Sequence, residues 1–215
     1  MEESDLSGFS GPAQIVAQGY DLVADKYVRL EAGAEWPRMR WLGKVLERLE
    51  PGSAVLDLGC GSGDPAGIEI AKMHQITGVD VSQSQINLAR QNVPSGTFIH
   101  GDAGSADFPA ASFDAVVSFY TLEHLPREEH QGLLARIHQW LRGNGYLLIS
   151  TEAAEIEEIV GEWLEVPMYF SSFDSETVMG MVETAGFEIL ETAVEPQMEG
   201  EDEISYLWLL ARKKG

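Results

Sequence analysis

The sequence predicts an α/β fold in which a largely parallel sheet is covered by helices on both faces. Short apolar runs alternate with helical patterns along the chain, which is the order of repeated strand and helix units. The first apolar run, Ala54 to Leu58, leads directly into the turn Gly59-Cys60-Gly61-Ser62-Gly63. The last two runs have no helix between them, so we expect them to pair as an antiparallel hairpin at one side of the sheet.

Five strands are predicted in the parallel part of the sheet, each at a run rich in apolar and β-branched residues. They are Ala54 to Leu58, Ile76 to Val81, Thr97 to His100, Phe113 to Phe119 and Tyr146 to Ser150. The terminal hairpin is predicted from Phe187 to Val194 and from Ile204 to Ala211.

Helix signals fill the gaps between these strands. Ser82-Gln83-Ser84-Gln85 has the capping-box spacing and predicts a helix that runs to about Asn92. Asp64-Pro65 predicts an N-cap and first helical residue, and Pro126 opens a helix that ends before Gly143, the expected C-cap. Further helices are predicted at Ala13 to Leu30, Trp36 to Leu49 and Asp174 to Ala185, the last closed by Gly186.

The length and composition indicate a single domain. With 215 residues and 44% hydrophobic composition, the chain is long enough for one sizeable core. We expect an N-terminal helical cap (1–50), a core that carries the glycine-rich turn (51–151), an insertion (152–173) and a C-terminal helix and hairpin (174–215). No run approaches a membrane span and the N-terminus does not resemble a signal peptide, so a cytoplasmic protein is expected. The one cysteine, Cys60, gives neither a disulfide nor metal-ligand spacing, and no metal is expected.

The charge is strongly acidic and unevenly distributed. The formal net charge is −21, and no Lys or Arg occurs from Gly143 to Ala211, where 16 acidic residues lie between Glu152 and Glu203. Such a surface repels phosphate, which argues against nucleic-acid and membrane-surface partners. The acidic half either attracts an amine-bearing small molecule or is a solvated surface that keeps the protein soluble.

Candidate binding residues follow the strands, because ligands of open parallel sheets bind at the carboxyl ends of the strands. Asp80 lies about 20 residues beyond the glycines, where an acidic side chain accepts hydrogen bonds from ribose hydroxyls. Asp102 is placed to accept from an adenine amino group, and Val81 to give the base an apolar surface. Asp57 either holds the turn or meets a ligand ammonium group.

These segments make the chain similar to class I S-adenosylmethionine-dependent methyltransferases of the small-molecule kind, related to ubiquinone and menaquinone biosynthesis methyltransferases. The resemblance runs from about Tyr20 to Arg212. It implies a Rossmann-like three-layer sandwich whose seven-stranded, mostly parallel sheet has the order 3-2-1-4-5-7-6. The resemblance implies that four segments contact the cofactor. Asp57 to Gly63 would contact its methionine part, Gly78 to Ser82 its ribose and Gly101 to Ala103 its adenine. Ser118 to Leu125 would lie beneath the methionine part and face the acceptor.

The resemblance implies S-adenosylmethionine as cofactor and methyl transfer by in-line displacement to a small, partly apolar molecule. The attacking atom is left open among O, N, S and C. The residues expected to contact the cofactor are Asp57, Gly59, Cys60, Gly61, Gly63, Asp80, Val81, Asp102, Ala103 and Phe119, with Tyr20 and Tyr27 closing over it. His124 is the candidate general base and Tyr120 the candidate for orienting the acceptor. The alternative for His124 is a packing role with a bond to backbone.

The insertion is where we expect the acceptor to bind. Trp163, Met168, Tyr169 and Phe170 form an apolar cluster there, which is either a lid lining an acceptor pocket or ordinary core. The expected partner is a small molecule, with the protein a monomer or homodimer.

Two rival functions remain open from the sequence. The first is a nicotinamide-dependent oxidoreductase. The spacing argues against it, because such an enzyme would carry Gly-x-Gly-x-x-Gly and this chain has Gly-x-Gly-x-Gly. A module that binds S-adenosylmethionine without catalysis is the other alternative, and turnover would exclude it.

Overall fold

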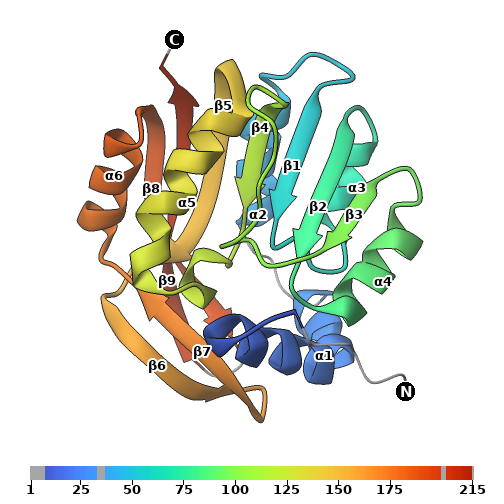
Figure 1. Cartoon of the computed structure of the whole chain (residues 1–215), viewed down its shortest axis with the longest axis vertical. Coiled ribbons are helices and arrows are strands. Elements are labelled where there is room, and N and C mark those ends of the chain that lie inside the picture. Colours follow the sequence, from blue (N-terminus) through green and yellow to red (C-terminus); the bar gives the residue numbers. More distant parts are fainter. Residues whose placement is uncertain (1–7, 33–36, 200–201, 215) are drawn as a thin grey trace.

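Seven strands form the central sheet in the order β3-β2-β1-β4-β5-β9-β8 (Figure 1). The structure is a computed structural model that describes residues 8–32, 37–199 and 202–214. The strands are β1 Ala54–Leu58, β2 Gln75–Asp80, β3 Thr97–His100, β4 Phe113–Ser118, β5 Leu141–Glu152, β8 Phe187–Glu199 and β9 Asp202–Lys213. β1 to β5 run parallel, whereas β9 is antiparallel to both β5 and β8.

The predicted strand order is confirmed, with β8 and β9 as its sixth and seventh strands. The sequence prediction missed two further strands, β6 (Ile156–Trp163) and β7 (Val166–Ser172), which form a separate two-stranded sheet within the expected insertion. The prediction also made β5, β8 and β9 too short. Strand pairing with a long partner extends all three beyond their apolar runs, since β8 and β9 pair from Phe187 with Lys213 to Glu199 with Asp202.

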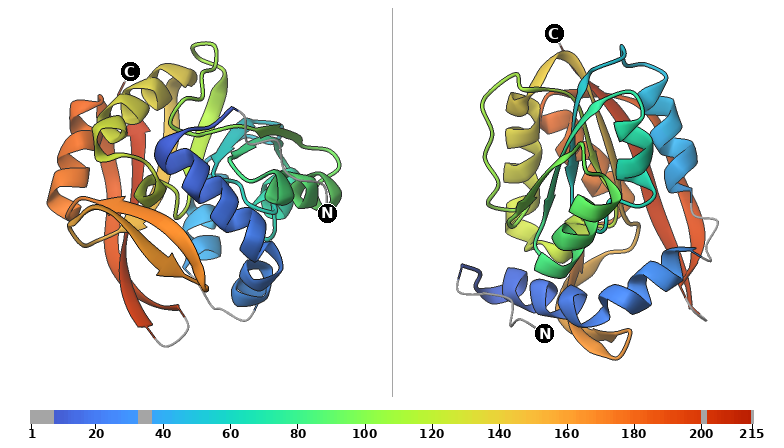
Figure 2. Two further views of the ribbon diagram at one scale, coloured as in Figure 1. Left: turned by 60° about the horizontal axis from the view of Figure 1, so that its bottom comes forward. Right: turned by 90° about the vertical axis from the view of Figure 1, so that its right-hand side faces the viewer.

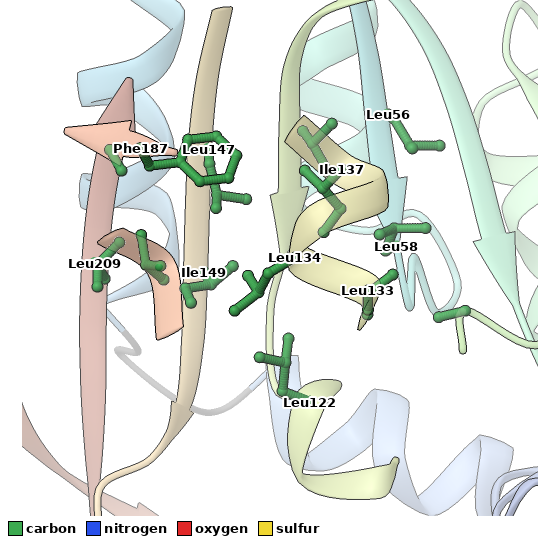
Figure 3. Close-up of a cluster of buried hydrophobic side chains, with 14 of the residues drawn as sticks. Leu56, Leu58, Leu122, Leu133, Leu134, Ile137, Leu147, Ile149, Phe187 and Leu209 are labelled. Atoms are coloured by element: carbon green, nitrogen blue, oxygen red, sulfur yellow. The ribbon is translucent and has the colours of Figure 1, made fainter. Parts of the chain in front are cut away.

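Helices cover both faces of the sheet, as the right-hand view of Figure 2 shows. α2 (Arg38–Leu46), α3 (Ala66–Ala71) and α4 (Gln83–Asn92) pack on one face, and α5 (Arg127–Trp140) and α6 (Ser175–Thr184) on the other. A hydrophobic core lies on each face of the sheet. Alternate residues of β1 pack into one core or the other, because successive side chains of a strand point to opposite faces. Leu56 and Leu58 belong to the α5 side, shown in Figure 3, and Val55 to the α2 side. Within the described residues, no helix is both long and apolar enough to cross a membrane.

The helix ends test the predicted caps. Ser82 caps α4, its Oγ accepting from the Gln85 N–H at 3.1 Å, as predicted. The predicted cap at Asp64 is wrong, because α3 begins only at Ala66 and Pro65 occupies the capping position without a side-chain hydrogen bond. The predicted C-cap at Gly143 is also wrong. α5 passes directly into β5, which already begins at Leu141 in extended backbone.

α1 (Gly11–Ala32) and the β6–β7 hairpin lie at the end of the sheet where the parallel strands finish (Figures 1 and 2). α1 contacts both β7 and α4. Gly19 permits the approach to the hairpin, since a Cβ there would lie 2.7 Å from Cε of Met168. The second predicted helix corresponds to α2, and its predicted start at Trp36 lies outside the described residues. The edge that carries the expected ligand residues is therefore covered by α1 and the hairpin.

We expect Leu134→Ala to destabilise the fold by about 2–5 kcal/mol, because it removes a buried side chain and leaves a cavity between α5 and the sheet. Leu134 is 1% exposed. The matched control is Leu22→Ala, the same change at a helical side chain that is 72% exposed, which should alter stability by less than about 0.5 kcal/mol. Urea unfolding followed by circular dichroism measures both, and equal losses would contradict the assigned core.

Candidate functional site

The turn after β1 forms one wall of the site. Gly59 and Gly61 have φ of 72° and 52°, the left-handed region that glycine enters without strain. A Cβ on Gly59 would lie 2.0 Å from Oγ1 of Thr121, so a side chain at this position would clash. The backbone N–H groups of Gly59 and Cys60 donate to the carbonyl oxygen of Val79 at 2.8 and 3.0 Å, which ties the turn to β2.

A first cavity, with an empty volume of about 600 Å³ including its open mouth, lies against this turn. Its walls come from the carboxyl ends of the parallel strands and from α1. The predicted site residues that line it are Gly59, Gly61, Asp80, Val81, Asp102, Ala103, Phe119, Tyr20, Tyr27, Tyr120 and His124. Gly63 does not line it, because this glycine faces Ala89 and Val93 at α4.

Asp80 presents a carboxylate to the first cavity with fixed geometry. Its Oδ2 accepts from the Gly61 N–H at 2.8 Å and its Oδ1 from the Ser82 N–H at 2.9 Å. Burial raises the pKa of Asp80 to about 6, although the two backbone donors oppose the rise. Each oxygen retains a second lone pair, so the ionised carboxylate suits a ligand that offers hydroxyl donors.

Gln85 is a wall residue that the sequence analysis used only as part of a helix cap. In a capping box this side chain would bond the N–H of Ser82, but Asp80 accepts from that N–H instead. Gln85 is 1% exposed, and neither its Oε1 nor its Nε2 has a hydrogen-bond partner among the described residues. A buried amide without partners at a cavity wall indicates a polar ligand.

A second, narrower cavity of about 320 Å³ adjoins the first through Gly59 and Gly61. Asp57 and Cys60, both predicted cofactor contacts, line this cavity. Burial, with the neighbouring Asp80 and Asp57 charges, raises the pKa of the Cys60 thiol, so the thiol stays neutral and is no nucleophile.

Arg38 also lines the second cavity and was missed by the sequence analysis. It is buried, and its guanidinium carbon lies 5.0 Å from the centre of the Tyr120 ring and 5.8 Å from that of Phe119. A cation and the carboxylate of Asp57 in one cavity suit a ligand that carries both an ammonium and a carboxylate group. Nothing in the run Pro37 to Leu46 distinguishes Arg38 from the exposed Arg40.

His124 joins three elements around the first cavity. It ends η1 (Leu122–His124), a short 3-10 helix after β4. Its Nδ1 lies 2.9 Å from the carbonyl oxygen of Tyr169 in β7, and because a carbonyl only accepts, Nδ1 carries the proton. Its Nε2 then accepts from the Tyr20 hydroxyl of α1 at 2.9 Å. Burial lowers the pKa of His124 to about 4, so the ring is neutral at pH 7.

Tyr120 is held by both its backbone and its hydroxyl. Its φ is 53°, its N–H donates to Oγ of Ser150 at 3.1 Å, and its hydroxyl donates to Oε1 of Gln197 at 2.7 Å. Burial raises the pKa of Tyr120 well above its ordinary value, so the phenol stays protonated. A protonated phenol that already donates to Gln197 is not a proton acceptor at neutral pH.

A third cavity, with an empty volume of about 340 Å³ including its open mouth, adjoins the first. It is lined by Tyr20, Tyr27, Tyr120, Glu123, His124, Trp163, Phe170 and Glu199. Trp163 and Phe170 were predicted for an acceptor pocket. Met168 and Tyr169 were predicted with them but do not line this cavity: Met168 packs against Val16 of α1, and the Tyr169 carbonyl bonds His124.

Glu199 was missed by the sequence prediction, whereas Glu123 lies in the segment Ser118 to Leu125, expected near methionine and acceptor, but was given no role of its own. Glu123 is only 3% exposed, and its Oε2 has no hydrogen-bond partner among the described residues. Burial raises the pKa of Glu123 to about 8, with added repulsion from Glu152 and Glu199. No signal in the sequence singles out Glu123 within its segment, and Glu199 lies in an acidic run.

Comparison with known proteins finds methyltransferases. Residues 55–145 match a methyltransferase domain family. A probable S-adenosylmethionine-dependent methyltransferase of Mycolicibacterium smegmatis is 27% identical over 66% of this chain and 54% of its own length. A 2-methyl-6-phytyl-1,4-hydroquinone methyltransferase of Synechocystis is 33% identical over 49% of this chain and 32% of its own. The chain spans less than two thirds of the length of the curated relatives that it matches first.

Solved structures show the same fold. The 1,6-didemethyltoxoflavin-N1-methyltransferase of Burkholderia thailandensis, solved with 1,6-didemethyltoxoflavin and S-adenosylhomocysteine bound, superposes with a TM-score of 0.73 at 19% identity. The match covers 96% of this chain and 92% of that one. The matched domain begins at β1 and spans the glycine-rich turn, Asp80 and Asp102. The chain is therefore similar to S-adenosylmethionine-dependent methyltransferases, in sequence over its central part and in fold over most of its length.

Proposed function

We propose that this chain transfers a methyl group from S-adenosylmethionine to a small molecule held in the third cavity. One observation carries the proposal: Tyr20, Tyr27, Tyr120 and His124 line both the first and the third cavity. In-line displacement requires the methyl donor and the acceptor to meet in one water-poor space, and adjoining cavities with shared walls meet that requirement.

The residues of the first two cavities fit the cofactor. The Asp80 carboxylate would accept from the ribose hydroxyls, and the unpartnered Gln85 amide would face a polar group of the ligand. Arg38 and Asp57 would hold the carboxylate and the ammonium group of the methionine end. When bound, S-adenosylmethionine supplies a methyl group already activated on a sulfonium, so the protein contributes mainly alignment and exclusion of water.

We also propose that the β6–β7 hairpin is the lid of the site, within the expected insertion at residues 152–173. Trp163 and Phe170 line the third cavity from the hairpin. The hairpin is joined to the rest of the site by the bond from His124 to the Tyr169 carbonyl and by the packing of Met168 on α1. His124 and Tyr120 then serve first as positioning groups, since both already hydrogen-bond other elements.

Asp80→Asn should weaken the binding of S-adenosylhomocysteine by about 10-fold or more, because the amide replaces one charged acceptor by a donor. Isothermal titration calorimetry of the full chain measures this loss, with NADH as a ligand expected not to bind. The control is Asp107→Asn, the same change at an exposed carboxylate, which should bind normally. Absence of S-adenosylhomocysteine binding to the folded wild-type chain would overturn the proposed function.

Affinity for S-adenosylhomocysteine should fall by about 10-fold from pH 7 to pH 5. Asp80 has a pKa of about 6, so it is ionised at pH 7 and mostly protonated at pH 5, where one oxygen no longer accepts. Titrations at half-unit pH steps measure the change. Asp80→Asn should show a flat profile over this range, and an equal pH dependence in the variant would assign the effect to another group.

Turnover separates catalysis from the alternative of a binding module without activity. The measurement is formation of S-adenosylhomocysteine from S-adenosylmethionine in the presence of candidate acceptors. Acceptor-dependent formation is the expected result. Tight cofactor binding without turnover on amines, phenols or thiols would favour the binding module.

A further inference from the structure

We propose that the acceptor is a small amine, held as an ammonium ion in the third cavity by Glu123 and Glu199 and by the faces of the surrounding aromatic rings. This inference rests on the proposed methyl transfer and names its substrate class. It assigns the attacking atom as nitrogen.

The first support is the buried carboxyl of Glu123. It is 3% exposed, lines the cavity, and has one oxygen without a hydrogen-bond partner among the described residues. A buried polar atom in this state costs free energy until a ligand donates to it. A ligand that brings both a donor and a positive charge satisfies it best, because charge-assisted hydrogen bonds are the stronger ones.

The second support is the second carboxyl in the same cavity. Glu199 accepts from the Tyr206 hydroxyl at 2.6 Å and from the Gln197 amide at 3.2 Å, and both bonds go to Oε1. These donors fix the side chain, and among the described residues no hydrogen bond goes to its Oε2, which is therefore available to a ligand. None of the cavity-lining residues that the structure describes is Lys or Arg. Two carboxylates ionised together in one apolar cavity would repel one another, and a cation between them removes that repulsion.

The third support is the aromatic wall. The rings of Tyr20, Tyr27 and Trp163 contact one another, with centroids 5.4 to 5.6 Å apart and tilted or edge-on geometry. Phe170 and Tyr120 complete the lining. Aromatic faces attract ammonium ions electrostatically, and they also cover the apolar part of a small amine. The rings can therefore contact both the ammonium group and the apolar part of such a ligand.

The distribution of charge around the cavity also favours a cation. The segment from Gly143 to Ala211, which has no Lys or Arg, supplies Trp163, Phe170 and Glu199 to the lining. Glu152 of β5 adds a negative charge that acts on Glu123. An excess of acidic over basic side chains raises the local concentration of small cations.

The arrangement also provides for the proton that an ammonium ion must lose before it can attack. The pKa of Glu123 lies near 8 in the free protein because of burial and of repulsion from Glu152 and Glu199, with Tyr120, His124 and Tyr206 as the other titratable groups around it. A bound ammonium ion would favour the ionised carboxylate. Proton transfer from the ammonium to that carboxylate then leaves a neutral amine with its lone pair free.

The transfer balances in atoms and electrons. The amine lone pair forms the new N–C bond to the methyl group, and the S–C bond breaks with its electron pair remaining on sulfur. The positive charge moves from sulfur to nitrogen, so the products are a methylated ammonium ion and neutral-sulfur S-adenosylhomocysteine. The proton removed from the substrate resides on Glu123.

Calorimetry with matched ligand pairs tests the inference on the full chain saturated with S-adenosylhomocysteine. The probes are small primary and secondary amines, such as 2-phenylethylamine, each beside its neutral alcohol isostere, such as 2-phenylethanol. We expect amines to bind at least 10-fold more tightly than their alcohols. Binding near pH 7 should release about one proton from Glu123, seen as a dependence of the heat on buffer ionisation enthalpy.

Glu123→Gln is the decisive variant, because it keeps the shape and removes the charge. It should abolish the preference for amines and the proton release, while Glu157→Gln, the same change at an exposed residue of β6, should keep both. Each variant is first titrated with S-adenosylhomocysteine. If S-adenosylhomocysteine fails to bind the wild-type chain, the proposed function is overturned. If it binds, three results would overturn the amine inference alone: alcohols that bind as tightly as their amines, no binding of any amine, or a Glu123→Gln variant that keeps the preference for amines.

Discussion

The hydrogen bonds between the glycine-rich turn and the end of β2 are the interaction on which the site depends. The Gly59 and Cys60 N–H groups donate to the Val79 carbonyl, and the Gly61 N–H donates to the Asp80 carboxylate. One set of bonds therefore fixes the backbone that forms a cavity wall and the acidic side chain that faces the cavity. Asp80 also accepts the hydrogen bond from the Ser82 N–H, which Gln85 would accept in a capping box. The Gln85 amide therefore has no partner at the helix start and lies at the cavity wall.

The second organising contact is the pair of bonds to His124. Through Tyr20 and the Tyr169 carbonyl, this neutral ring links α1, η1 and β7, which are far apart in the sequence. A protonated ring could not accept from Tyr20, so the low pKa that burial imposes preserves the contact at physiological pH. The covering elements are thus attached to the parallel sheet at the loop that follows β4.

Local sequence patterns predicted the parts of the fold that depend on local chemistry. The run Ala54 to Leu58 and the cap at Ser82 were predicted correctly because apolar periodicity and capping act within a few residues. The cap at Asp64 failed because Pro65 takes the N-cap position and not the first helical position that the sequence pattern favours. Arg38 and Glu199 were not predicted at the site and Glu123 was not singled out, since the cavities that they line bring together segments more than 70 residues apart, which no local pattern records.

The shared walls of the first and third cavities limit how the specificity of such a protein can change. A substitution at Tyr20, Tyr27, Tyr120 or His124 alters the surroundings of both ligands at once. Trp163, Phe170 and Glu199 line only the third cavity, and they come from the hairpin and the end of β8. If the proposed function holds, divergence toward new acceptors is expected to accumulate in these late segments, while the tyrosines of α1 would be constrained by the proposed cofactor contacts.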